Sequence, residues 1–120
     1  MEADESLLRA AYEAFNTRDL DAAVALMHPD VDWPNAWEGG RVHGHEGVRD
    51  YWRRQWSAID PVAQAVAFTT RPDGSIGVEV DQVTRSLDGT LLGEARVRHV
   101  YGFRDDLIAR MDVEELTSAG

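Results

Sequence analysis

The second half of the chain alternates long strand-like segments with very short turns, and this pattern limits the possible folds more than any other feature. Three turn signals separate the segments: Pro72-Asp73-Gly74, Asp88-Gly89 and Asp105-Asp106. They predict four strands, at 62–70, 76–87, 91–103 and 107–116. Turns this short leave no room for a crossover connection, so consecutive strands must pair antiparallel.

In the first half, apolar residues recur at helical spacing. Four of them follow the i, i+3, i+4, i+7 pattern of one helix face: Leu8, Ala11, Tyr12 and Phe15. This stripe predicts a helix over about residues 3–17. Asp19 is a suitable N-cap for a second helix, which must end near His28 because Pro29 follows.

A short strand and a third helix complete the first half. The strand is predicted at 31–33 and ends before Pro34. The helix follows Gly47, ends before Pro61, and carries a stripe that we expect to be core, with a ring edge facing a pocket: Val48, Tyr51, Trp52 and Trp56. The order ααβαββββ predicts an α+β fold in one domain over residues 1–120. Three N-terminal helices would pack on a strongly curved, mainly antiparallel sheet and leave a cone-shaped hollow.

The charge balance argues against two classes of partner. The chain has 22 Asp and Glu against 12 Lys and Arg, a net charge of −10. Nucleic acid and anionic membranes would be repelled, so we expect neither as a partner.

The chain has no cysteine, which excludes disulfides and thiolate chemistry and is typical of a cytoplasmic protein. No apolar run approaches the ~20 residues of a membrane span.

His99 is the first candidate site residue. In the long strand 91–103, alternation places Val97, His99, Tyr101 and Phe103 on the more apolar face, toward the hollow. A histidine in an apolar pocket is a candidate acid–base group. The alternative is a core histidine whose ring is satisfied by a backbone carbonyl or by Tyr12. The sequence leaves both open.

The loop after the first strand is the second candidate. Trp33, Asn35 and Trp37 cluster there with Asp32, ahead of Gly39-Gly40. Two indole rings around one amide predict a ligand lid, and the alternative is aromatic packing that plugs the open end of the cone. The nearby His43-x-His45-Glu46 is a weak metal signal, and we expect His45 and Glu46 to cap the third helix instead. We expect no metal and no cofactor.

Several segments resemble the nuclear transport factor 2-like superfamily, which includes ketosteroid isomerases, SnoaL-type polyketide cyclases and limonene epoxide hydrolase. The segments that carry the resemblance are residues 12–27, with their Asn16-x-x-Asp19-Leu20-Asp21 corner, residues 44–52, and residues 100–105. The resemblance implies the cone-shaped fold predicted above. It also implies a homodimer formed through the outer sheet face, on which Arg96, Arg98 and Val100 would lie.

The comparison with ketosteroid isomerases is negative. Their tyrosine falls on Ala11, their general-base aspartate on Asn35, and their protonated aspartate on His99. An amide does not abstract a proton and alanine does not donate one, so the isomerase constellation is absent.

The comparison with the cyclases is better. Their histidine and aspartate, on the last two strands, resemble His99 and Asp112. A shift of one residue in the last strand would instead put Val113 at the acid position. Asp112 is otherwise a surface residue paired with an arginine. In the hydrolases, two aspartates would correspond to Asp81 and Asp112, but Glu79 stands where the bridging arginine is expected.

Two functional hypotheses follow. The first is a cofactor-free cyclase or isomerase for a small apolar oxygenated molecule, with His99 and Asp112 as the catalytic pair. The residues that would contact the substrate are Tyr12, Trp33, Asn35, Trp37, Trp52, Asp81 and Tyr101. The second is a binding or protein-association module without catalysis, which uses the same hollow or the open sheet face. If Asp112 points to solvent, the second hypothesis gains.

Overall fold

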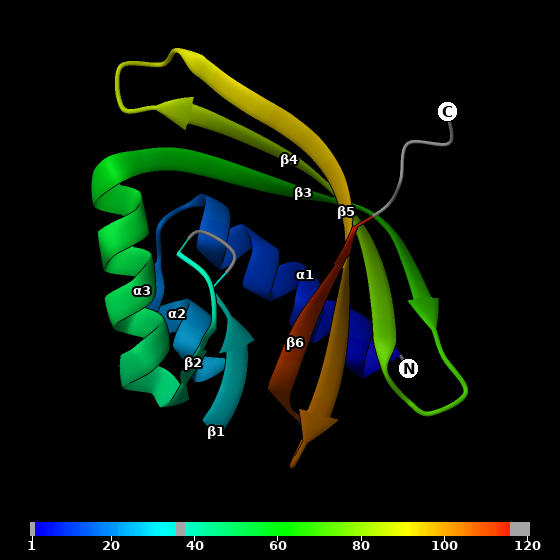
Figure 1. Cartoon of the computed structure of the whole chain (residues 1–120). Coiled ribbons are helices and arrows are strands. Elements are labelled where there is room, and N and C mark those ends of the chain that lie inside the picture. Colours follow the sequence, from blue (N-terminus) through cyan, green and yellow to red (C-terminus); the bar gives the residue numbers. More distant parts are fainter. Residues whose placement is uncertain (1, 36–37, 116–120) are drawn as a thin grey trace.

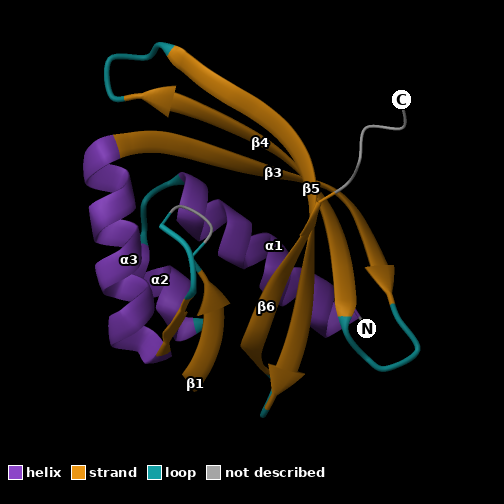
Figure 2. Cartoon of the chain, viewed as in Figure 1, coloured by secondary structure: helices purple, strands orange, loops and turns teal. Residues whose placement is uncertain are grey.

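The structure, a computed structural model, describes residues 2–35 and 38–115. Within these residues, three helices and six strands follow one another. They are α1 (Glu2–Asn16), α2 (Leu20–Ala25), β1 (Met27–Pro34), β2 (Arg41–His43), α3 (Gly44–Ala58), β3 (Ile59–Thr70), β4 (Ile76–Ser86), β5 (Leu91–Arg104) and β6 (Leu107–Glu115). The sheet bends around the helices, which lie on its concave side (Figures 1 and 2). The predicted α+β fold is confirmed.

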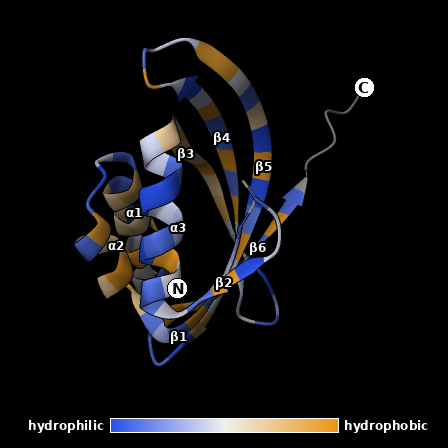
Figure 3. Ribbon diagram, turned by 60° about the vertical axis from the view of Figure 1, so that its left-hand side comes forward, coloured by the Kyte–Doolittle hydropathy of each residue, from blue (hydrophilic) through white to orange (hydrophobic). Residues whose placement is uncertain are grey.

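The sheet has the strand order β2-β1-β6-β5-β4-β3. The hairpins β3–β4, β4–β5 and β5–β6 are antiparallel, as predicted, whereas β1 and β6 run parallel. Irregular registers in all three hairpins, between Ala65 and Ala67, Thr84 and Arg85, and Gly102 and Phe103, increase the local twist. Figure 3 shows the result from the side, with apolar and polar residues alternating along the strands.

Several predicted boundaries are wrong. The first strand spans Met27–Pro34 rather than 31–33, and the third helix begins at Gly44 rather than after Gly47. The second helix ends at Ala25 rather than near His28, because Met27 already pairs with Ile108 of β6. The third strand begins at Ile59, before Pro61, since β3 is an edge strand and a missing N–H is tolerated there. The strand β2 was predicted as loop, so the order is ααββαββββ.

The corner between α1 and β3 positions the helical layer. The side chain of Asn16 donates to the carbonyl of Ala63 at 2.7 Å and accepts from its N–H at 2.9 Å, which completes the open edge of β3. Arg18 adopts φ 64° and donates to Asp60 and to the carbonyl of Pro61. Asp19 then caps α2 by accepting from Ala22 N at 3.1 Å. These contacts fix α1 over the concave face.

Candidate functional site

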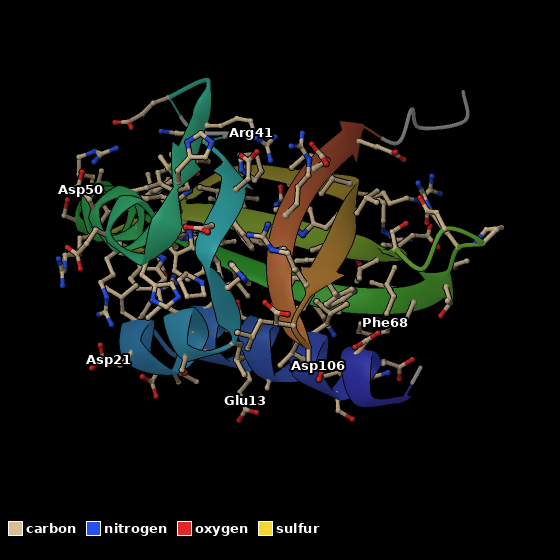
Figure 4. All side chains as sticks on the ribbon, turned by 90° about the horizontal axis from the view of Figure 1, so that it is seen from below. Glu13, Asp21, Arg41, Asp50, Phe68 and Asp106 are labelled. Carbon is tan, nitrogen blue, oxygen red and sulfur yellow. The ribbon has the colours of Figure 1, made fainter. Side chains whose placement is uncertain are left out.

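A cavity of about 300 Å³ lies between the helices and the concave face of the sheet. Nineteen of the described residues line it: Ala11, Tyr12, Phe15, Met27, Trp33, Pro34, Tyr51, Trp52, Gln55, Ile59, Pro61, Val62, Ala63, Gln82, Thr84, His99, Tyr101, Met111 and Val113. None of these nineteen is Asp, Glu, Lys or Arg. The acidic side chains labelled in Figure 4, such as Glu13, Asp21 and Asp50, lie at the periphery. The described cavity lining is therefore uncharged, whereas these acidic side chains lie on the exposed surface.

Aromatic rings form one wall of the cavity. Trp33, on β1, meets Trp52, on α3, edge to face at 5.6 Å between ring centroids. Phe15 meets Trp52 in the same way at 5.2 Å. Trp56 packs behind, against Phe15 and Trp52, as the predicted core stripe requires. Flat rigid walls of this kind favour planar apolar guests.

Three of the polar side chains that line the cavity, Tyr101, Tyr12 and His99, form a row of hydrogen bonds. The Tyr101 hydroxyl donates to the Tyr12 hydroxyl at 2.8 Å, and the Tyr12 hydroxyl lies 2.7 Å from His99 Nδ1. On the other side of the imidazole, the Gln82 amide nitrogen lies 3.4 Å from His99 Nε2. The two interpretations of His99 are thus compatible, because its ring is satisfied by Tyr12 and also lines the cavity.

Burial keeps this row uncharged. His99 is 5% exposed, and desolvation lowers its pKa to about 4. Burial likewise raises the pKa of Tyr12 and of Tyr101 above the ordinary value. At neutral pH the imidazole and both phenols are therefore neutral.

Asp112 does not lie with His99. In the antiparallel pair β5–β6, Val113 lies opposite His99 and Asp112 lies opposite Val100. The irregular register opposite Gly102 reverses the alternation, so Ile108 and Met111 are both buried and Asp112 belongs to the other face. The alternative register of the last strand, in which Val113 takes the position of the cyclases' catalytic aspartate, is therefore the one that the structure shows.

On that outer face, Asp112 belongs to an ionic cluster. Arg110 donates to it at 2.8 Å and Arg41 at 3.1 Å, and both arginines also contact Asp32. The hydrogen bond from Arg110 lowers the pKa of Asp112, and the one from Arg41 lowers that of Asp32. This cluster joins β2, β1 and β6. Asp81, the other predicted carboxylate, also lies outside the cavity and pairs with Arg96.

Asn35 does not lie where the predicted ligand lid would require it. Asn35 is buried, but its side chain accepts from Glu38 N at 2.7 Å and donates to Glu38 Oε1 at 2.9 Å. It braces its own loop and is not among the cavity-lining residues. Trp37 lies outside the described residues. Of the predicted substrate contacts, the cavity brings together Tyr12, Trp33, Trp52 and Tyr101.

Gln82 was missed in the sequence, although a signal was present. Ile76, Val78 and Val80 alternate on the inner face of β4, and Gln82 and Thr84 continue that series. The sequence instead suggested Asp81 as a substrate contact, but Asp81 lies on the outer face of β4 and pairs with Arg96.

No group of three His, Asp or Glu side chains in residues 2–35 and 38–115 is placed to hold a metal ion. His45 does not cap α3 with its side chain. It donates instead from Nε2 to the carbonyl of Met27 at 2.9 Å. None of the helices in the described part of the chain is long and apolar enough to cross a membrane.

A curved sheet that bends around three helices, with a cavity between the two layers, defines a class of small α+β domains. The chain belongs to the SnoaL-like domain family, whose model matches residues 8–111. The resemblance to nuclear transport factor 2-like proteins is therefore confirmed. No curated protein matches the chain.

Solved structures support the fold. TerC, co-crystallised with polyporic acid, is 24% identical with a TM-score of 0.82, covering 98% of this chain and 94% of TerC. A putative polyketide cyclase from Xanthomonas campestris pv. campestris is 21% identical with a TM-score of 0.80, covering 93% and 89%. Rv0760c from Mycobacterium tuberculosis, in complex with estradiol-17beta-hemisuccinate, is 16% identical with a TM-score of 0.81, covering 96% and 95%. At these identities the likeness concerns the fold alone.

Proposed function

We propose that this protein binds a small, uncharged, mainly apolar molecule in the cavity between the helices and the sheet. One observation carries the proposal: in a chain of net charge −10, the residues of the described ranges that line a cavity of about 300 Å³ carry no formal charge. That volume is about twice the roughly 150 Å³ of an engineered cavity that binds benzene, so it suits a guest of two or three rings. Two of the structural neighbours have a small molecule bound, polyporic acid with TerC and estradiol-17beta-hemisuccinate with Rv0760c, which supports a small-molecule guest.

A pair of matched fluorescent probes tests this proposal. N-phenyl-1-naphthylamine is neutral, and 8-anilino-1-naphthalenesulfonate has the same ring system with an added sulfonate. We expect the neutral probe to bind and the anion to bind at least about tenfold more weakly, because a buried charge without a partner is costly. Ala63→Leu places a larger side chain in the cavity and should weaken binding of the neutral probe. Val66→Leu, at an exposed position of the same strand, is the matched control and should leave that binding unchanged. Equal binding of both probes, or binding unaffected by Ala63→Leu, would contradict the proposal.

The second candidate function is cofactor-free acid–base catalysis of the cyclase or isomerase type. The observation that favours it is the buried row Tyr101–Tyr12–His99, which is open to the cavity at His99. In this case His99 would be the catalytic group without Asp112, which belongs to the ionic cluster outside. A turnover that depends on His99 but is unchanged in Asp112→Asn would support this candidate.

We further propose that two copies associate through the outer face of the sheet and that the protein is cytoplasmic. On that face the charges of Arg96 and Arg98 are balanced within the chain by Asp81 and Glu114. Leu92, on the same strand, is 57% exposed. Sedimentation should give twice the 13.4 kDa chain mass, and Leu92→Arg should shift the protein toward the monomer. A monomer at tens of micromolar would contradict the dimer.

A further inference from the structure

The hydrogen-bonded row at the end of the cavity determines which nitrogen of His99 carries the proton. The row has two contacts, Tyr101–Tyr12 and Tyr12–His99 Nδ1. Each contact uses one proton. The two phenols already supply two, so a proton on Nδ1 would be a third. One of the two hydroxyls would then have no acceptor within the row and would be left as an unsatisfied donor there.

With the proton on Nε2, both hydroxyls and Nδ1 are satisfied. Tyr101 donates to Tyr12, and Tyr12 donates to the lone pair of Nδ1. The Nε2–H then points away from the row, toward Gln82. Because His99 is neutral at neutral pH and Nδ1 is occupied, the imidazole presents one N–H donor and no lone pair on the Gln82 side.

Gln82 supplies the second donor. Its amide nitrogen lies 3.4 Å from Nε2, and both side chains line the cavity. Two N–H groups at this separation do not satisfy each other, but a single oxygen placed between them accepts from both.

We infer that the site selects its ligand by hydrogen-bond polarity: His99 Nε2–H and the Gln82 amide together bind one acceptor oxygen of an uncharged guest, such as a ketone carbonyl, while Tyr12 and Tyr101 are positioning residues that hold His99 in the donor tautomer. This inference rests on the proposed function and adds a chemical class to it. A carboxylate would also accept these bonds, but no cation lines the cavity to balance its charge. A guest without oxygen would leave the two donors unpaired.

Two ligands with the same carbon skeleton test the inference. 2-Acetonaphthone carries the carbonyl, and 2-isopropenylnaphthalene has CH₂ in place of its oxygen. In the natural protein we expect the ketone to bind about tenfold more tightly, as a buried acceptor with two donors should. Gln82→Leu should reduce this ratio and His99→Phe should abolish it. Thr84→Val, on the same inner face two residues along β4, is the matched control and should keep it.

A second measurement reports on the positioning residues directly. The ring-nitrogen NMR shifts of His99 should show the Nε2–H tautomer in the natural protein. Tyr12→Phe should shift His99 to a mixture of tautomers and lower the ketone preference about threefold, and Tyr101→Phe should do so less. If a histidine or tyrosine variant does not fold, two measurements still test the inference. They are the ketone-to-alkene binding ratio of Gln82→Leu and the His99 tautomer of the natural protein.

The outcomes separate the inference from the proposed function. If ketone and alkene bind equally, or if His99 carries its proton on Nδ1, the inference is wrong while the apolar pocket stands. If neither ligand binds the folded protein, the proposed function fails and the inference fails with it.

Discussion

Replacing His99 by phenylalanine should remove a specific part of the pH dependence of stability. In the fold, burial lowers the pKa of His99 from 6.5 to about 4. The unfolded chain therefore binds a proton below pH 6.5 that the folded protein does not take up until about pH 4. The stability that the neutral imidazole contributes is complete above pH 6.5 and is lost as the pH falls toward 4.

The size of this loss follows from the two pKa values. Between 6.5 and about 4, the full contribution is about 3 kcal/mol. Between pH 7 and pH 5, where few carboxylates titrate, about 2 kcal/mol of it should already be lost. His99→Phe should be less stable than the natural protein at pH 7, by about 1–3 kcal/mol, because Tyr12 loses its acceptor. Its stability should nevertheless change much less between pH 7 and pH 5.

The assay is urea unfolding, followed by tryptophan fluorescence at pH 7, 6 and 5. His43→Gln is the matched control, since it removes a histidine that lies outside the cavity lining and whose side chain is 71% exposed. If His99→Phe loses as much stability between pH 7 and pH 5 as the natural protein does, His99 is not the buried neutral base described here.

Three further substitutions test the contacts that hold the cavity in shape. Asn16→Leu removes both hydrogen bonds to the backbone of Ala63 and should destabilise the protein by about 1–3 kcal/mol in urea unfolding; a change below about 0.5 kcal/mol would mean that this corner does not hold the edge strand. Asp19→Ala removes the α2 cap and should cost about 1 kcal/mol, with a normal stability ruling out the capping role. Arg41→Met opens the outer ionic cluster and should cost more at low salt than at 1 M NaCl, whereas a salt-independent effect would point to packing instead.

The sequence was sufficient for most of the fold because its signals were local and periodic. The helical stripe from Leu8 to Phe15 and the turn at Asp88-Gly89 specify their elements without long-range information. The strand β2 was missed because it has three residues in a glycine-rich segment and no alternation to detect. This strand forms because Arg41–His43 pair with β1, and that pairing is a tertiary contact that local sequence does not reveal.

The site was harder to predict because it depends on register. His99 and Tyr101 were placed correctly by alternation within one strand, and Tyr12 was named as the partner of His99. Asp112 was named as the partner of His99, with a surface residue paired with an arginine as the alternative. The structure shows the alternative, because the irregularity between Gly102 and Phe103 leaves no mark in the sequence. Gln82 was predictable from its apolar neighbours on β4, but its role appears only once His99 lies beside it.

The most direct test of the whole account is to locate a neutral guest by NMR. Intermolecular NOEs from bound N-phenyl-1-naphthylamine should reach the rings of Trp33, Trp52 and His99, which line the cavity. The protein also exposes leucines near the β4–β5 turn, Leu87 and Leu91 among them. NOEs confined to those leucines would show that the guest adheres to the surface and that the cavity is not the binding site.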